Sequence, residues 1–218
     1  MDSLLIFTQI MLINILLSGD NAIVIAMASQ HLPPRQRQRA IWWGAGAAVG
    51  LRCVLTLVAV TLLQVPYLQA AGAVLLFMIA VKLLLDSGSG ESGHAVRKSD
   101  TLVMAVWTIV AADFVMSLDN VLAIAAVAEG DPVLIILGIV LSIPLIIWGS
   151  QLIGSMLARM PQLVYLGAGL LGFAGGKMLV HDRGLQEVLF HGSRTAAEAV
   201  PLLSVPLVIV LYLLCRRA

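Results

Sequence analysis

Apolar stretches long enough to cross a membrane follow one another along the chain, and short polar segments separate them. A membrane-spanning helix needs roughly 20 predominantly apolar residues. Seven stretches come close to or exceed that length, at about 4–28, 40–64, 67–86, 101–128, 132–156, 162–181 and 199–215. The pattern therefore predicts an all-α fold, a polytopic membrane helix bundle of seven spans.

The first three predicted spans are repeated by the next three. Pro66 and Lys82 recur at one constant offset as Pro161 and Lys177. Because three spans are an odd number, the two copies enter the membrane from opposite sides, which defines an inverted-topology repeat. We expect a single transmembrane domain over 1–218, made of repeat 1 at 4–86, a flexible cytoplasmic loop at 87–100, repeat 2 at 101–181, a polar outer loop at 182–198 with a short surface helix, and an extra C-terminal helix at 199–215.

Composition and charge set the class and the orientation. The chain is 60% hydrophobic and only 11% charged, which leaves no room for a sizeable soluble domain and points to the lipid bilayer, not nucleic acid, as its environment. Basic side chains outside the spans divide eight to two between the two sides of the predicted bundle. The positive-inside rule places the richer side in the cytoplasm, so we expect the N-terminus outside and the C-terminus inside. The eight are Arg35, Arg37, Arg39, Arg97, Lys98, Arg159, Arg216 and Arg217, and the two are Arg183 and Arg194.

A polar motif occurs twice, each time inside an apolar span. An Asp at the centre of a membrane helix costs about 2.5–3.5 kcal/mol on insertion scales, and such residues usually mark an ion pathway. Two matched copies in oppositely inserted spans predict one site built from two halves. The first copy consists of Asn14, Ser18, Asp20 and Asn21, and the second of Asp113, Ser117, Asp119 and Asn120.

Helical geometry gives the motif two faces. In the second copy Asp113, Ser117 and Asn120 share one stripe of a straight helix, and Asp119 lies about 120° away from it. The first copy has the same spacing. Either the two aspartates face different neighbours, or the helices are broken near 18–19 and 117–118, where freed carbonyls can act as ligands.

The donors of this motif suit a hard cation. Carboxylate and amide oxygens prefer Mg²⁺, Ca²⁺ or Mn²⁺, and the spans hold no interior His that would favour a softer metal. Crowded carboxylates also hold a proton more tightly, which offers proton exchange for metal. The alternative is that the motif only joins helices through polar contacts. The predicted metal ligands are Asp20, Asn21, Asp113, Asp119 and Asn120, supported by Asn14, Ser18 and Ser117.

Three cations and one outer-loop acid complete the candidates. Arg52, near the middle of span 2, is either a structural ion-pair partner of an aspartate or a tethered cation that occupies the carboxylates when no metal is bound. Lys82 and Lys177 lie near span ends, where snorkelling to the interface is favoured over a coupling role. His181 and Asp182 are expected to be solvated, with a metal-gathering vestibule as the alternative.

The segments SGDNAIVIA at 18–26 and SLDNVLAIA at 117–125 resemble the two signature segments of the TerC family of bacterial membrane proteins. GLR at 50–52 and SIP at 142–144 resemble its YjbE-type branch. The resemblance implies inverted three-helix repeats and export of Mn²⁺ from the cytoplasm. It also implies a metal role for Asp20, Asn21, Asp119, Asn120 and Asp113. Asn14 stands in the place of Asp113, so Asp113 can be a proton carrier instead of a ligand.

The sequence thus predicts a divalent-cation exporter, with Mn²⁺ as the expected ion, in the bacterial cytoplasmic membrane. It would work by alternating access at a midplane site, with proton coupling left open and no tightly bound cofactor. The alternative is a membrane subunit that delivers or senses metal for a partner protein. A homo-oligomer is also open. No enzyme is expected, because the membrane aspartates lack the GxGD motif of intramembrane proteases and no intramembrane Ser–His pair exists.

Overall fold

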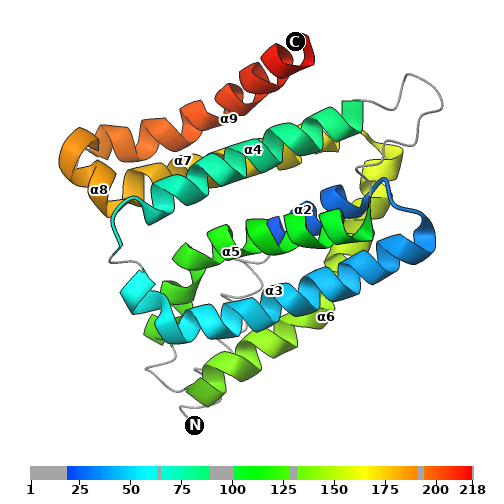
Figure 1. Ribbon diagram of the computed structural model, residues 1–218, viewed down its shortest axis with the longest axis horizontal. Helices are drawn as coiled ribbons and strands as arrows, with labels where there is room; N and C mark the ends of the chain where they lie inside the picture. Colours follow the sequence, from blue (N-terminus) through cyan, green and yellow to red (C-terminus); the bar gives the residue numbers. More distant parts are fainter. Residues whose placement is uncertain (1–18, 63–64, 89–100, 128–131, 191–193, 218) are drawn as a thin grey trace. The chain divides into compact units, whose positions relative to one another are not determined.

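The computed structural model describes residues 19–62, 65–88, 101–127, 132–190 and 194–217 (Figure 1). Within these ranges every regular element is helical and no strand occurs. The chain divides into two compact units. Unit 1 comprises 1–60 and 98–155, and unit 2 comprises 61–97 and 156–218.

Unit 1 is built from four helices that meet in one apolar core. They are α2 (Gly19–Ser29), α3 (Pro34–Leu62), α5 (Leu102–Val127) and α6 (Pro132–Arg159), of which α3 and α6 continue a few residues beyond the unit. Helices α2 and α5, which hold the two motif copies, pack against each other. All four helices contribute to the core, which consists of Ile25, Ile41, Ala45, Ile109, Ile146 and Ile147.

Helix α3 starts earlier than the sequence predicts. We expected a span at 40–64 preceded by a basic loop, but the helix begins at Pro34 and includes all three arginines of that segment. Proline is favoured in the first turn of a helix, because its missing N–H has no partner there in any case. Arginine and glutamine are also good helix formers. The basic segment is therefore the solvated first turns of α3 instead of a loop.

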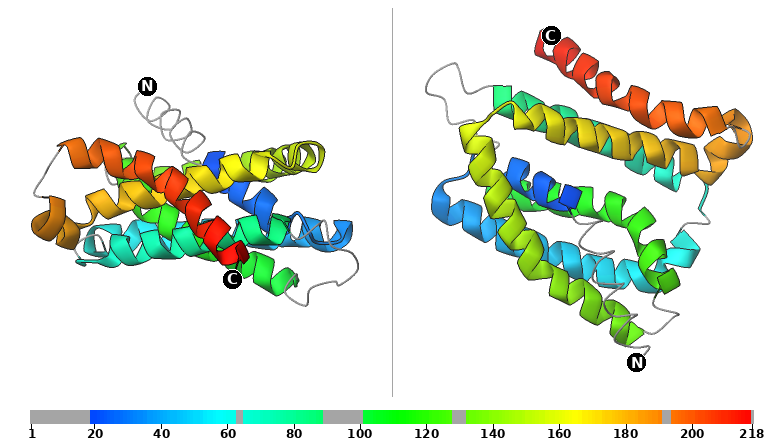
Figure 2. Two further views of the ribbon diagram at one scale, coloured as in Figure 1. Left: turned by 90° about the horizontal axis from the view of Figure 1, so that it is seen from above. Right: turned by 180° about the vertical axis from the view of Figure 1, so that it is seen from behind.

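Unit 2 contains α4 (Leu68–Gly88), α7 (Leu163–His181) and α9 (Arg194–Arg217), and α7 packs against both of the others (Figure 2). Glycines on α7 make the close approach to α9. A side chain at Gly172 would lie 2.8 Å from Val208 and 2.9 Å from the backbone oxygen of Ser204. Gly176, one turn later, lies against Ser204 and Pro201 in the same way. Small residues spaced four apart are a common means of bringing membrane helices together.

Asp182 joins the elements of unit 2. Its carboxylate accepts the N–H groups of Tyr67 at 3.2 Å, Ala70 at 3.1 Å and Leu185 at 3.0 Å. It thereby caps the start of α4 and of the short α8 (Arg183–Leu185), which continues into the π-helical turn η2 (Gln186–Phe190). The expectation that Asp182 is solvated is wrong, because its side chain is buried.

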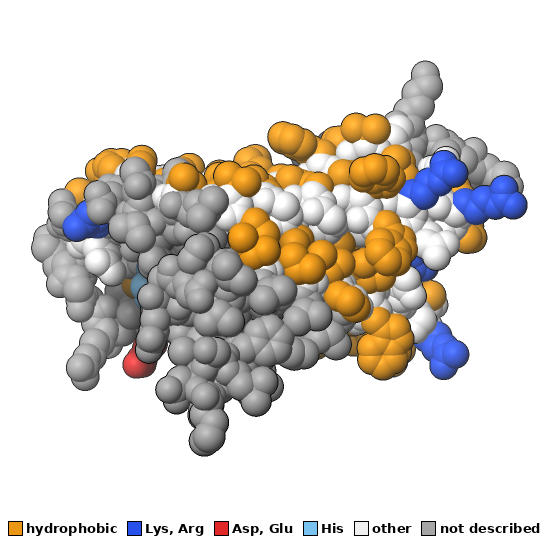
Figure 3. All heavy atoms as spheres, turned by 90° about the horizontal axis from the view of Figure 1, so that it is seen from below, with side chains coloured by type: hydrophobic (Ala, Val, Ile, Leu, Met, Phe, Trp, Pro, Cys, Tyr) orange, Lys and Arg blue, Asp and Glu red, His pale blue; other side chains and the backbone are white. Residues whose placement is uncertain are grey.

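The helices and the surface fit a membrane. Among the described residues three helices are both long and apolar enough to cross a bilayer, Leu68–Ser87, Leu163–His181 and Glu198–Arg216. Helices α3, α5 and α6 run for 29, 26 and 28 residues, more than the roughly 20 that a span needs. Hydrophobic side chains cover much of the described surface in Figure 3. The count of seven spans and the inverted repeat stay predictions.

Candidate functional site

Helix α5 supplies the fixed part of the site. It runs unbroken from Leu102 to Val127, so the helix break considered near 117–118 does not occur. Asp113 and Ser117 lie one turn apart on its buried face, and the Ser117 hydroxyl donates to Asp113 Oδ2 at 3.1 Å. The stripe predicted for this helix thus faces the interior of unit 1 at both positions.

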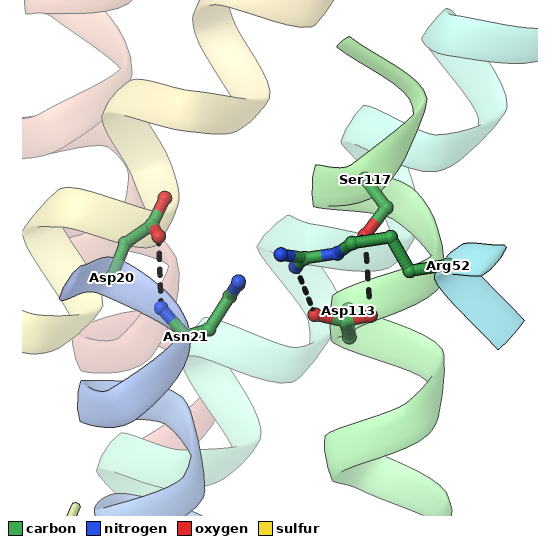
Figure 4. Close-up of polar contacts among 5 residues, drawn as sticks. All are labelled: Asp20, Asn21, Arg52, Asp113 and Ser117. Carbon is green, nitrogen blue, oxygen red and sulfur yellow. Dashed lines mark hydrogen bonds and ion pairs between the residues drawn. The ribbon is translucent and has the colours of Figure 1, made fainter. Parts of the chain in front are cut away.

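Arg52 of α3 reaches this pair. Its Nη2 lies 2.6 Å from Asp113 Oδ1, and its Nε donates to Ser117 Oγ at 3.0 Å (Figure 4). Only 1% of the Arg52 surface is exposed, so the ion pair is shielded from water. Each member of this three-residue cluster satisfies part of the hydrogen-bonding capacity of the other two. Breaking a buried pair of this kind leaves an uncompensated charge, which is strongly destabilising.

Asn21 of α2 is the exception in this otherwise paired interior. Its side chain is 4% exposed, and among the described residues neither its amide nitrogen nor its amide oxygen has a hydrogen-bond partner. Figure 4 shows the amide pointing towards Arg52 and Asp113. A buried amide left without partners costs about 1–3 kcal/mol, so such groups are rare in folded proteins and call for an explanation.

A small cavity lies between Asn21 and the Arg52–Asp113 pair. Its volume is about 10 Å³, and apart from these three side chains the described residues that line it are apolar. That volume holds about one water-sized particle. The cavity therefore fits a dehydrated ion or a single water molecule, but no organic substrate.

Asp20 takes a different direction from its neighbour. Its side chain is only half-buried, and its Oδ1 accepts the backbone N–H of Asn21 at 2.8 Å. In Figure 4 it projects away from the Arg52–Asp113 pair, and it does not line the cavity. The structure therefore brings together Asn21, Arg52, Asp113 and Ser117, while Asp20 lies next to Asn21 in the chain and outside the cavity lining.

Four other predicted site residues cannot be placed in this way. Asn14 and Ser18 lie outside the described residues, and so do the side chains of Asp119 and Asn120 on α5. Lys82 and Lys177 belong to unit 2, on α4 and α7. Within the described part of the chain no three His, Cys, Asp or Glu side chains gather in one place.

Two features escaped the sequence analysis. Asp182 carries a local signal, since it directly follows a predicted span as a helix cap would, but its bonds to Tyr67 and Ala70 join segments more than 110 residues apart. The orphaned amide of Asn21 depends on what surrounds it in space, which no spacing rule reveals.

The fold, the lipid-facing surface and the buried polar cluster together define a helical integral membrane protein. The profile of the integral membrane protein TerC family matches residues 1–218, so the chain belongs to the TerC family. It is 44% identical over 209 residues to the uncharacterized membrane protein YjbE of Bacillus subtilis (strain 168), covering 95% of this chain and 94% of that protein.

Two further relatives come from the same organism. The uncharacterized membrane protein YceF is 28% identical over 170 residues, which cover 75% of this chain and 66% of YceF. The uncharacterized membrane protein YkoY is 26% identical over 183 residues, which cover 76% of this chain and 56% of YkoY. No solved structure matches the chain.

Proposed function

We propose that the protein exports divalent metal ions from the cytoplasm, with Mn²⁺ as its principal cargo, through a site at the contact of α2 and α5. The observation that carries the proposal is the buried Asn21 amide, which has no partner among the described residues and faces Asp113 across a cavity of about 10 Å³. The amide oxygen of Asn21 and the buried carboxylate of Asp113 could both coordinate a cation without any rearrangement of the backbone.

The donor set favours a hard cation. Asn21 and Asp113 contribute oxygen atoms, and the described residues that line the cavity include no His or Cys. Asp20, Asp119 and Asn120 are the remaining oxygen ligands that the motif predicts, and they would complete the shell as the helices move. Because the cavity holds about one water-sized particle, the ion would give up most of its hydration shell there. Each lost water then has to be replaced by a protein oxygen, which is how such a site selects for size.

Arg52 has a defined part in this proposal. In the structure its guanidinium neutralises Asp113. It would keep that carboxylate compensated when no metal ion is bound, and a divalent ion would then compete with the guanidinium for the same oxygens. The two roles predicted for Arg52 would then belong to one side chain. It would pair with Asp113 when no metal ion is bound, and a bound ion would displace it. The pair costs least to break when the incoming cation replaces the charge that leaves.

Transport itself can be measured in everted vesicles that enclose a Mn²⁺-sensitive dye. We expect the wild-type protein to load the vesicles with Mn²⁺ and the Asp119→Asn and Asn21→Leu variants to fail, although both insert normally. Glu198→Gln is the matched control, because it removes an exposed carboxylate from α9 and should leave transport unchanged.

Two outcomes would contradict the proposal. Normal Mn²⁺ uptake by Asn21→Leu would remove that residue from the pathway. Wild-type vesicles that bind Mn²⁺ but never accumulate it would favour a subunit that delivers or senses metal for a partner protein. Metal-dependent shifts of the melting temperature with Mn²⁺, Mg²⁺, Ca²⁺, Zn²⁺ and Co²⁺ then rank the ions, since a ligand that binds only the folded protein raises Tm according to its affinity.

A further inference from the structure

All four tryptophans of the chain belong to unit 1 and are exposed. Trp42 and Trp43 lie on α3, Trp107 on α5 and Trp148 on α6, with 57%, 69%, 68% and 68% of their surface exposed. Exposed tryptophans in membrane proteins concentrate at the boundary between hydrocarbon and headgroups. Their positions therefore mark a membrane interface on this unit.

The four tryptophans lie near the same end of unit 1. An apolar cluster of Leu32, Ala40 and Ala105 joins the start of α3 to the start of α5. A pocket lined by Pro34 and Ser155, among others, joins the start of α3 to the last turns of α6. At a rise of 1.5 Å per residue, the tryptophans lie about 8–17 Å along their helices from this end. The segments 32–41 and 151–155, which lie between these tryptophans and the end, are therefore at the depth of the lipid headgroups.

The pocket at this end has both polar and apolar lining residues. It has a volume of about 380 Å³ and lies between the first turns of α3 and the last turns of α6. Arg37, Gln38 and Gln151 supply hydrogen-bond donors, Leu32 and Ile41 supply apolar surface, and the described lining contains no carboxylate. Such a volume is large enough for a glycerophosphate headgroup with the first part of its acyl chains.

Arg37 is placed to bind an anion in this pocket. Its side chain is half-buried and lies directly over Gly154 of α6, where a methyl group would collide with the guanidinium. Among the described residues it has neither an ion-pair partner nor a side-chain hydrogen bond. Arg35 and Arg39, in the same segment, are exposed and do not line the pocket. A guanidinium with free donors in a fork is well suited to the oxygens of a phosphate group.

We propose that this pocket binds the headgroup of an anionic phospholipid, with Arg37 on its phosphate and Leu32 and Ile41 against its acyl chains. The predicted topology puts this end on the cytoplasmic side, where anionic lipids attract basic side chains and basic pockets between helices hold headgroups. The inference concerns a second site and does not depend on the transported ion.

The test uses the full chain purified in detergent, with lipid binding followed by native mass spectrometry and by thermal stability. Phosphatidylglycerol should bind and raise Tm, whereas phosphatidylcholine at the same concentration should do so much less. We expect Arg37→Gln and Gly154→Ala to weaken phosphatidylglycerol binding at least about tenfold, a loss of about 1.4 kcal/mol. Arg35→Gln, which removes the same charge outside the pocket, should change it less than about twofold.

Gly154→Ala keeps every charge and only displaces the guanidinium of Arg37. Arg37→Lys keeps the charge but loses the forked arrangement of donors. These two variants test the role of Arg37 if Arg37→Gln fails to fold. Equal losses of phosphatidylglycerol affinity in Arg35→Gln and Arg37→Gln would mean that basic charge attracts the lipid without a defined site, which would overturn the proposed pocket site. If inorganic phosphate raises Tm as much as phosphatidylglycerol does, the pocket binds a soluble anion, and the proposal of a lipid ligand is overturned. Unchanged binding in Gly154→Ala would overturn the role of Arg37.

Discussion

Among the described residues, the buried polar side chains of unit 2 have partners, whereas in unit 1 the amide of Asn21 has none. Asp182 accepts three N–H groups, and the Ser204 hydroxyl donates to the Val200 carbonyl at 2.7 Å. Unit 1 has its own satisfied cluster around Arg52, yet it keeps an unpaired amide beside it. Polarity in unit 2 stabilises the fold, whereas under the proposed function part of the polarity in unit 1 serves to bind an ion.

The largest expected effect comes from breaking the buried ion pair of unit 1. Arg52→Met leaves Asp113 charged and uncompensated, and we expect a loss of about 3–5 kcal/mol in unfolding free energy. The double variant Arg52→Met/Asp113→Leu removes both charges and should recover most of that loss, while metal transport stays absent. Denaturant titration of both variants in detergent measures the difference. Equal instability of single and double variants would mean that the charge is not the cause.

The stability of unit 2 should depend on side-chain volume at the contact of α7 and α9 instead of on charge. Gly172→Ala puts a methyl group less than 3 Å from Val208 and the Ser204 backbone, so we expect α7 and α9 to separate at a cost of about 1–3 kcal/mol. Gly46→Ala is the matched control, because nothing lies within 4 Å of that position on α3. That control should be neutral or slightly stabilising. Thermal unfolding of the two variants side by side gives the comparison, and similar Tm values would refute it.

Asp182→Ala tests whether the buried carboxylate of unit 2 is structural. Losing a helix cap typically costs about 1–2 kcal/mol, so we expect a lower Tm with unchanged Mn²⁺ transport per folded molecule. Transport rates normalised to folded protein, measured in the same vesicles as the wild type, check this. A specific loss of transport would give Asp182 a part in the pathway, as in the vestibule considered from the sequence.

The smallest effect on stability should come from Asn21→Leu. This change replaces an unsatisfied buried amide with an apolar side chain of similar shape, so the free energy of unfolding should stay within about 1 kcal/mol or rise. Chemical denaturation without added metal is the measurement. A large loss of stability would show that Asn21 has a structural partner and would remove the contrast between the units.

Features that depend on neighbouring residues in the sequence could be predicted, whereas features that depend on packing in space could not. Apolar stretches predicted α4 and α7 within two residues at each end, because span length depends on composition alone. The stripe of Asp113 and Ser117 followed from helical periodicity. The ion pair of Arg52 with Asp113 did not follow from the sequence, since the pattern offered three aspartates as possible partners and only the folded structure brings these two side chains together. The start of α3 at Pro34 was not predicted, because the charged residues of its first turns were interpreted as a loop.

The most direct test of the account is Mn²⁺ binding to purified protein by equilibrium dialysis, with equal amounts of folded wild type, Asn21→Leu and Asp182→Ala. The account predicts saturable binding by wild type and Asp182→Ala, and a loss of at least about tenfold in affinity for Asn21→Leu, or about 1.4 kcal/mol. The same affinity in all three proteins would contradict it, because the unpaired amide of unit 1 would then have no part in holding the ion.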